Sequence, residues 1–125
     1  MYYSNEAPSR RPNLMGYSWW PDFNDPYDEC YIILDSAEAG AAGANGNYYH
    51  NTAVDALLAQ MKNADRETLT RDAYTLQDIT GHLDPPAIWT AEPAQVTILA
   101  KNVRGFVYNP IELRTYGFYT MYRAA

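Results

Sequence analysis

The sequence predicts an α/β fold. One strand and several helices come first, and a tail of strands follows, so the order of the elements is that of an α+β fragment. Three observations carry this prediction. An apolar run covers residues 14–20, helical periodicity covers residues 52–80, and short β-rich runs follow Pro85-Pro86. A chain of 125 residues is long enough for one domain with a modest core.

In residues 14–20, the side chains on both alternating faces are apolar. This pattern is typical of a strand that is covered on both sides. Pro21 ends the run, and a carboxylate-rich turn follows at once. Two interpretations of Trp19 and Trp20 remain open. They are core residues above a capped turn, or they form, with Asp22, a wall against a small organic ligand.

A helix is predicted to begin at Asp25-Pro26, with Asp25 as the N-cap and Pro26 at the first helical position. This helix should run through Leu34. Cys30 lies within it, and a small core side chain is the expected role of a single cysteine here.

Two further helices follow. The first begins at Thr52, where Thr52 and Asp55 have the spacing of a capping box, and the second begins after Asp65 and ends near Gly81. The connection of roughly three residues predicts an antiparallel pair. The expected apolar stripes are Val54, Leu57, Leu58 and Met61 in the first, and Leu69, Ala73, Leu76 and Ile79 or Thr80 in the second.

The remaining segments are predicted to be loops and strands. Residues 1–13 are a polar lead-in, and the small, Gly-rich residues 35–47 are a flexible surface loop, because they lack the Gly-Lys-Ser/Thr ending of a phosphate loop. The chain changes character near residue 84. The predicted strands after it are 87–91, 95–100, 105–108 and 116–122.

Composition excludes several classes of function. A net charge of −6 with scattered basic residues argues against a nucleic-acid partner. No apolar run approaches the roughly 20 residues that span a bilayer, and the N-terminus as written does not predict a secretion signal. Twelve Tyr and three Trp favour a surface for binding or association.

The carboxylates of the turn after Pro21 do not fit a calcium loop. Counting from Asp22, Tyr27 stands where an EF-hand needs Gly, and Ile33 where it needs Glu. Asp25 is explained as a helix cap, and Asp28 and Glu29 as charges in the first helical turn. Asp22 has no such role, so it is the carboxylate that we expect to contact a ligand.

No pattern in the sequence predicts catalysis. His50 and His82 lack partners at metal-ligand spacing, and the nucleophile turn Gly-x-Ser-x-Gly is absent, so a small hydrolase would rest only on scattered Asp, Ser and His residues. We therefore expect a protein that is not an enzyme and that needs no cofactor and no metal.

Four motifs in order resemble a known family. Trp19 to Tyr27 resembles the segment W-x-(P/A)-D-(Y/F)-x-D/E-P of family 5 extracellular solute-binding proteins, the dipeptide- and oligopeptide-type receptors of ABC importers. Tyr48 to Leu58 resembles their Y-x-N-x-x-V-D-x-L-L. A third match lies in Arg66 to Pro86, through Arg71, Tyr74, Gln77 and Pro85 or Pro86, and the fourth is the V-x-G-(Y/F) element at Val103 to Phe106.

This resemblance covers the chain from about Leu14 onward and implies the C-terminal portion of a two-lobe receptor. Residues 1–84 would end the second α/β lobe, and residues 85–125 would cross the hinge as strands of the first lobe. The implied activity is binding of a peptide or similar solute, followed by docking on a membrane permease. The implied location of the complete protein is periplasmic or extracellular.

The resemblance also implies roles for individual residues. Asp22 would pair with the α-ammonium of a peptide, and Trp19 and Trp20 would line side-chain pockets. The sequence departs from the peptide receptors at two places. Trp20-Pro21 stands where these receptors carry smaller residues, and Gly16 stands where some of them carry an Arg that binds the ligand's carboxylate. Sugars, opines and metal chelates are also ligands of this family.

A second hypothesis is a standalone interaction module that uses its aromatic side chains as a protein-binding surface. Self-association is expected under both hypotheses, because a fragment of a two-lobe protein would also expose apolar area.

Overall fold

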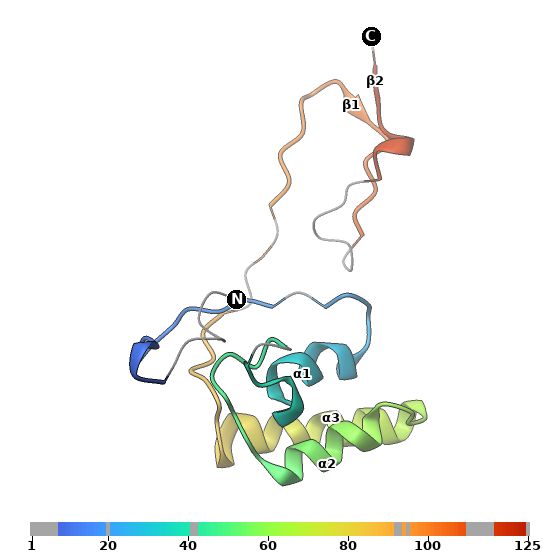
Figure 1. Cartoon of the computed structure of the whole chain (residues 1–125). Helices are drawn as coiled ribbons and strands as arrows, with labels where there is room; N and C mark the ends of the chain where they lie inside the picture. Colours follow the sequence, from blue (N-terminus) through green and yellow to red (C-terminus); the bar gives the residue numbers. More distant parts are fainter. Residues whose placement is uncertain are drawn as a thin grey trace. The chain divides into compact units, whose positions relative to one another are not determined.

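The computed structural model describes residues 8–19, 21–40, 43–91, 94, 96–109 and 117–124. The chain divides into two compact units, Met1–Trp89 and Thr90–Ala125. The α-helices of the described residues lie in the first unit, and a two-stranded sheet lies in the second (Figure 1). This mixture of helices and a small sheet is compatible with the predicted α/β class. The assignment of residues 1–84 and 85–125 to two lobes stays a prediction.

The first unit is built on three helices, α1 (Pro26–Leu34), α2 (Thr52–Met61) and α3 (Arg66–Asp78). Helices α2 and α3 run side by side in opposite directions, as the short connection predicts (Figure 1). Helix α1 packs against both of them. The buried core comes from all three helices and consists of Leu34, Val54, Leu58, Met61 and Leu76.

The start of α1 is confirmed. Asp25 has extended backbone angles, Pro26 is the first helical residue, and Oδ1 of Asp25 accepts a hydrogen bond from the N–H of Tyr27 at 2.8 Å. Cys30 lies on this helix, half-buried against the core.

The capping box predicted for α2 is wrong. Asn51, one residue earlier, is the N-cap, and its Oδ1 accepts hydrogen bonds from the N–H groups of Ala53 and Val54. The carboxylate of Asp55 instead accepts two hydrogen bonds from Ser36. The Ser36 N–H donates to Oδ1 at 3.0 Å, and the Ser36 hydroxyl donates to Oδ2 at 2.8 Å. The side chain of Asp55 thus ties α2 to a distant segment, which a local pattern does not reveal.

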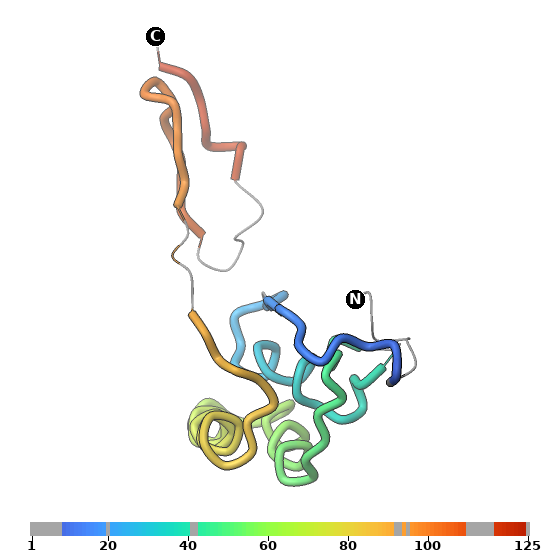
Figure 2. The backbone as a smooth tube through the Cα atoms, turned by 90° about the vertical axis from the view of Figure 1, so that its left-hand side faces the viewer, coloured from blue at the N-terminus to red at the C-terminus, as the bar shows by residue number. Residues whose placement is uncertain are grey.

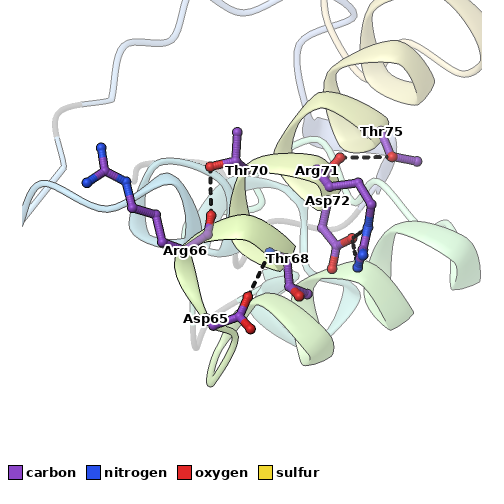
Figure 3. Close-up of polar contacts among 7 residues, drawn as sticks. All are labelled: Asp65, Arg66, Thr68, Thr70, Arg71, Asp72 and Thr75. Carbon is purple, nitrogen blue, oxygen red and sulfur yellow. Dashed lines mark hydrogen bonds and ion pairs between the residues drawn. The ribbon is translucent and has the colours of Figure 1, made fainter.

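Helix α3 begins as predicted and ends differently. Oδ1 of its N-cap Asp65 accepts a hydrogen bond from the N–H of Thr68, shown in Figure 3. Gly81 does not end the helix, because the chain continues beyond Asp78 as a π-helix, η4 (Ile79–Leu83). The N–H of Asp84 closes η4 on the carbonyl of Ile79, and the following prolines prevent further helix.

The described residues of segment 35–47, which leave out 41 and 42, contain regular structure where a flexible surface loop is predicted. It holds a 3-10 helix, η2 (Ser36–Glu38), and a bridge between Ala39 and Asn45. Asn45 is fully buried. Its amide group donates to the carbonyls of Asp35 and Tyr49 and accepts from the N–H of Tyr49. One buried amide therefore fixes this segment against the start of α2.

The predicted strand 14–20 is wrong over its described part. Residues 14–19 belong to no strand, and Leu14 is 81% exposed. A strand needs a neighbour to pair its backbone groups, and the described part of the first unit offers helices instead. Figure 2 shows this segment in blue, on the opposite side of α1 from the α2 and α3 pair.

The described residues after Pro86 contain less strand than predicted. Strand β1 (Val103–Arg104) pairs antiparallel with β2 (Tyr122–Arg123), Val103 opposite Arg123. Predicted strands 87–91, 95–100 and 105–108 contain no strand among their described residues. Within the predicted strand 116–122, the chain forms a 3-10 helix, η5 (Phe118–Thr120), and β2 begins only at Tyr122. Tyr116 lies outside the described residues.

Gly105 explains why β1 ends at Arg104 and does not continue into the predicted strand 105–108. Its φ is +76°, and a Cβ at this position would overlap the carbonyl of Thr120. The hydroxyl of Thr120 donates to the carbonyl of Gly105 at 2.7 Å. The glycine of the V-x-G-(Y/F) element is therefore required by the local backbone.

Candidate functional site

The candidate site lies in the turn between Trp19 and α1. The side chain of Asp22 is exposed, as are those of Phe23 and Asn24. Asp22 stands in a bend rather than at the predicted strand end. Its carboxylate is therefore free to meet a ligand from solvent.

The backbone of this turn is fixed by a residue whose role the sequence did not reveal. Asp28 is 1% exposed, and its Oδ2 accepts hydrogen bonds from the N–H groups of Asp22 and Phe23 at 2.5 and 3.1 Å. The N–H of Asp25 donates to the carbonyl of Phe23 at 2.9 Å. The prediction that Asp28 is merely a first-turn charge is incomplete. Its position three residues after the N-cap is the available signal, since such residues often reach back to the preceding backbone.

Trp19 is partly buried, and its indole Nε1 has no hydrogen-bond partner among the described residues. The described side chains that pack against the buried core do not include it. Trp20, the second predicted wall residue, lies outside the described residues. The choice between core and ligand wall therefore stays a prediction for both tryptophans.

The electrostatic potential beside the turn is negative. Burial raises the pKa of the Tyr31 hydroxyl, and the carboxylates of Asp28, Glu38 and Asp22 raise it further. The rings of Tyr27 and Tyr31 stack with centroids 4.8 Å apart. A negative field of this kind favours a cationic group over an anionic one.

A shallow hollow of about 260 Å³ opens where the start of α1 faces α3. Trp19 and Asp22 are not among its lining residues. The hollow is therefore a feature separate from the predicted site. It is lined by Asn24, Asp25, Pro26, Glu29, Cys30, Ala73 and Gln77.

Ser36, His50 and Asp55 come together, but not in the order of a hydrolase. The Ser36 hydroxyl donates to Asp55, while Nδ1 of His50 lies 2.6 Å from Ser36 Oγ. In a catalytic triad the carboxylate orients the histidine, and the histidine takes the serine proton. Here the serine proton points to the carboxylate instead. The three residues connect η2 to α2, and the arrangement does not activate Ser36.

The described residues were also compared with the requirements of a metal site and of a membrane-spanning helix. No group of three or more His, Cys, Asp or Glu side chains in the described part of the chain is placed to hold a metal ion. Within the same part, none of the helices has both the length and the apolar character needed to cross a membrane.

Comparison with known proteins gives one informative relative. The chain is 32% identical over 106 residues to the probable D,D-dipeptide-binding periplasmic protein DdpA of Escherichia coli strain K12. The match covers 83% of this chain and 20% of that protein, so the chain spans about a fifth of its relative's length. No family model matches the chain, and no solved structure matches it significantly. The similarity relates this chain to part of a solute-binding protein, and that relative is named as a binding protein rather than an enzyme.

Proposed function

We propose that this chain is the C-terminal portion of a family 5 solute-binding protein that delivers a small peptide to an ABC importer. The observation that carries the proposal is the 32% identity, over 83% of this chain, to the probable D,D-dipeptide-binding periplasmic protein DdpA. In this proposal residues 1–84 end the second lobe and residues 85–125 return to the first. The complete protein works in the periplasm or outside the cell, where it docks on a permease.

Asp22 pairs with the α-ammonium of the peptide. Its carboxylate is exposed, its backbone is held by Asp28, and the neighbourhood is negative. A charge-assisted hydrogen bond in a closed cleft is among the stronger contacts a protein can offer to an amine. Because the donor is an ammonium, the same site would reject a peptide whose amino group is acylated.

Trp19 and Trp20 form the apolar wall beside Asp22. Flat indole rings supply large contact area to small side chains. The opposing wall comes from the other lobe, so binding needs the hinge to close. We therefore expect the isolated 125-residue chain to bind dipeptides weakly or not at all. Submicromolar binding by this chain alone would overturn the two-lobe proposal.

The test is calorimetry on the complete receptor with D-alanyl-D-alanine, L-alanyl-L-alanine and the N-acetyl derivative of each. Asp22→Ala should weaken binding of the free dipeptide roughly tenfold to a hundredfold, since hydrogen bonds to charged groups contribute about 1.5–3 kcal/mol. Acetylation should weaken binding to the unaltered receptor and have little further effect on Asp22→Ala.

Asp78→Ala is the matched control, because Asp78 is an exposed carboxylate on α3. Its affinity should equal that of the unaltered receptor. An unchanged affinity in Asp22→Ala would remove Asp22 from the site. Preference for one dipeptide stereoisomer would define the substrate class.

A further inference from the structure

We propose that Asp28 is a positioning residue for ligand binding, which acts by holding the backbone of Asp22 and Phe23. The inference rests on the proposed function and adds a residue to its site. Residues 21–24 of the turn have exposed or half-buried side chains and no regular secondary structure. Such a turn has few contacts of its own to fix the direction of Asp22.

Asp28 provides the missing constraint from a rigid element. It lies in the first turn of α1, which packs against α2 and α3, and it is almost fully buried. One oxygen, Oδ2, accepts both the Asp22 and the Phe23 N–H. In an ordinary capping box, the residue at this position bonds to the N-cap N–H, but here the N–H of Asp25 is bonded to Phe23 instead. Asp28 therefore extends the cap three residues further, as far as Asp22.

The second oxygen of Asp28 argues against a purely stabilising role. Oδ1 is buried, and none of the described residues supplies it with a hydrogen bond. Burying a carboxylate with an unsatisfied oxygen costs free energy, and a buried charge is weak evidence for stability. What the residue supplies is geometry, since it fixes the Asp22 backbone before a ligand arrives. Such preorganisation lowers the entropy lost on binding.

The first experiment follows the two amides directly. Hydrogen exchange at Asp22 and Phe23, measured by NMR, should become faster in Asp28→Ala than in the unaltered receptor. Asp72→Asn is the matched control, because Asp72 is also a buried carboxylate with one unpartnered oxygen, but its other oxygen pairs with Arg71 on α3 (Figure 3). Exchange at Asp22 and Phe23 should be unaffected there. Unchanged exchange in Asp28→Ala would overturn the inference.

The second experiment is a double-mutant cycle for D-alanyl-D-alanine and L-alanyl-L-alanine binding. Asp28→Asn, which keeps the size of the side chain, should weaken binding roughly tenfold in the receptor and have no further effect in the Asp22→Ala background. A role in stability alone would give equal losses in both backgrounds. Equal losses, or no loss in either, would overturn the inference. Circular dichroism checks that each variant is folded.

The cycle separates failure of this inference from failure of the proposed function. If Asp22→Ala leaves affinity unchanged, the proposed site is wrong, whatever Asp28 does. If Asp22→Ala weakens binding while Asp28→Asn acts independently of it, only the positioning role is wrong.

Discussion

The two units of the chain bury their apolar side chains to very different extents. In the first unit Val54 is completely buried, and Leu58 and Leu76 are each 1% exposed. In the second, Val96 and Ile98 are 79% and 91% exposed. A helix satisfies its backbone hydrogen bonds internally and needs only one packed face, whereas a strand needs a neighbouring strand. The first unit therefore builds a core from its own residues, whereas the described residues of the second unit include no buried apolar side chain.

The largest effect expected from this difference is a loss of core packing in the first unit. Leu58→Ala should lower the free energy of unfolding by about 2–5 kcal/mol, because it removes a fully buried side chain between the helices. Leu83→Ala is the matched control, since Leu83 is 73% exposed in η4, and it should cost less than about 0.5 kcal/mol.

Urea unfolding followed by far-ultraviolet circular dichroism measures both variants, because the described α-helices lie in the first unit. Equal effects of the two substitutions would contradict the core that α1, α2 and α3 form.

A smaller effect, confined to the second unit, is expected at Gly105. Gly105→Ala should destabilise the β1 and β2 pairing by about 1–3 kcal/mol, because a Cβ there combines positive φ with overlap on the Thr120 carbonyl. Gly117→Ala, with φ −67° and no atom of the described residues within 4 Å of an added Cβ, should be neutral or slightly stabilising.

Hydrogen exchange separates the units in this test. The N–H of Ala124 donates to the carbonyl of Asn102 at 2.8 Å, so its exchange should become faster in Gly105→Ala. Amides of α2 should be unaffected. Faster exchange in α2 as well would mean that the two units unfold together.

The same difference explains which parts of the fold the sequence predicts. The helices are predicted because their signals are local: Asp25 and Asp65 cap the following turn, and Leu58 lies on a periodic stripe. The strands are overpredicted because β-rich composition says nothing about whether a partner strand is present. Leu14 and Ile98 have suitable neighbours in sequence, but both are largely exposed.

At the candidate site, sequence reasoning selects Asp22 by elimination, and the structure leaves its side chain exposed. It misses what holds Asp22, since the bonds from Asp28 span five and six residues and depend on the path of the turn. It also misses Asn45, whose amide fills a buried position in a segment with the composition of a loop. Polar groups that satisfy distant backbone are invisible to periodicity.

The smallest predicted effect is a dependence of stability on pH, which tests how far the packing of the first unit buries the Cys30 thiol. Burial, and secondarily Glu29, raises the pKa of the Cys30 thiol from 9.0 to about 11. Between these values the unfolded chain releases the thiol proton and the folded chain keeps it, so the folded state binds more protons and stability must fall as the pH rises. Half-burial also raises the pKa values of the Tyr31 and Tyr49 hydroxyls, which act in the same direction. Cys30→Ala isolates the thiol contribution: from about pH 8 to about pH 10.5, the unaltered chain should lose more unfolding free energy than the variant. Equal losses would mean that the packing of α1 on the core does not shield the Cys30 thiol from water to the extent that the structure describes.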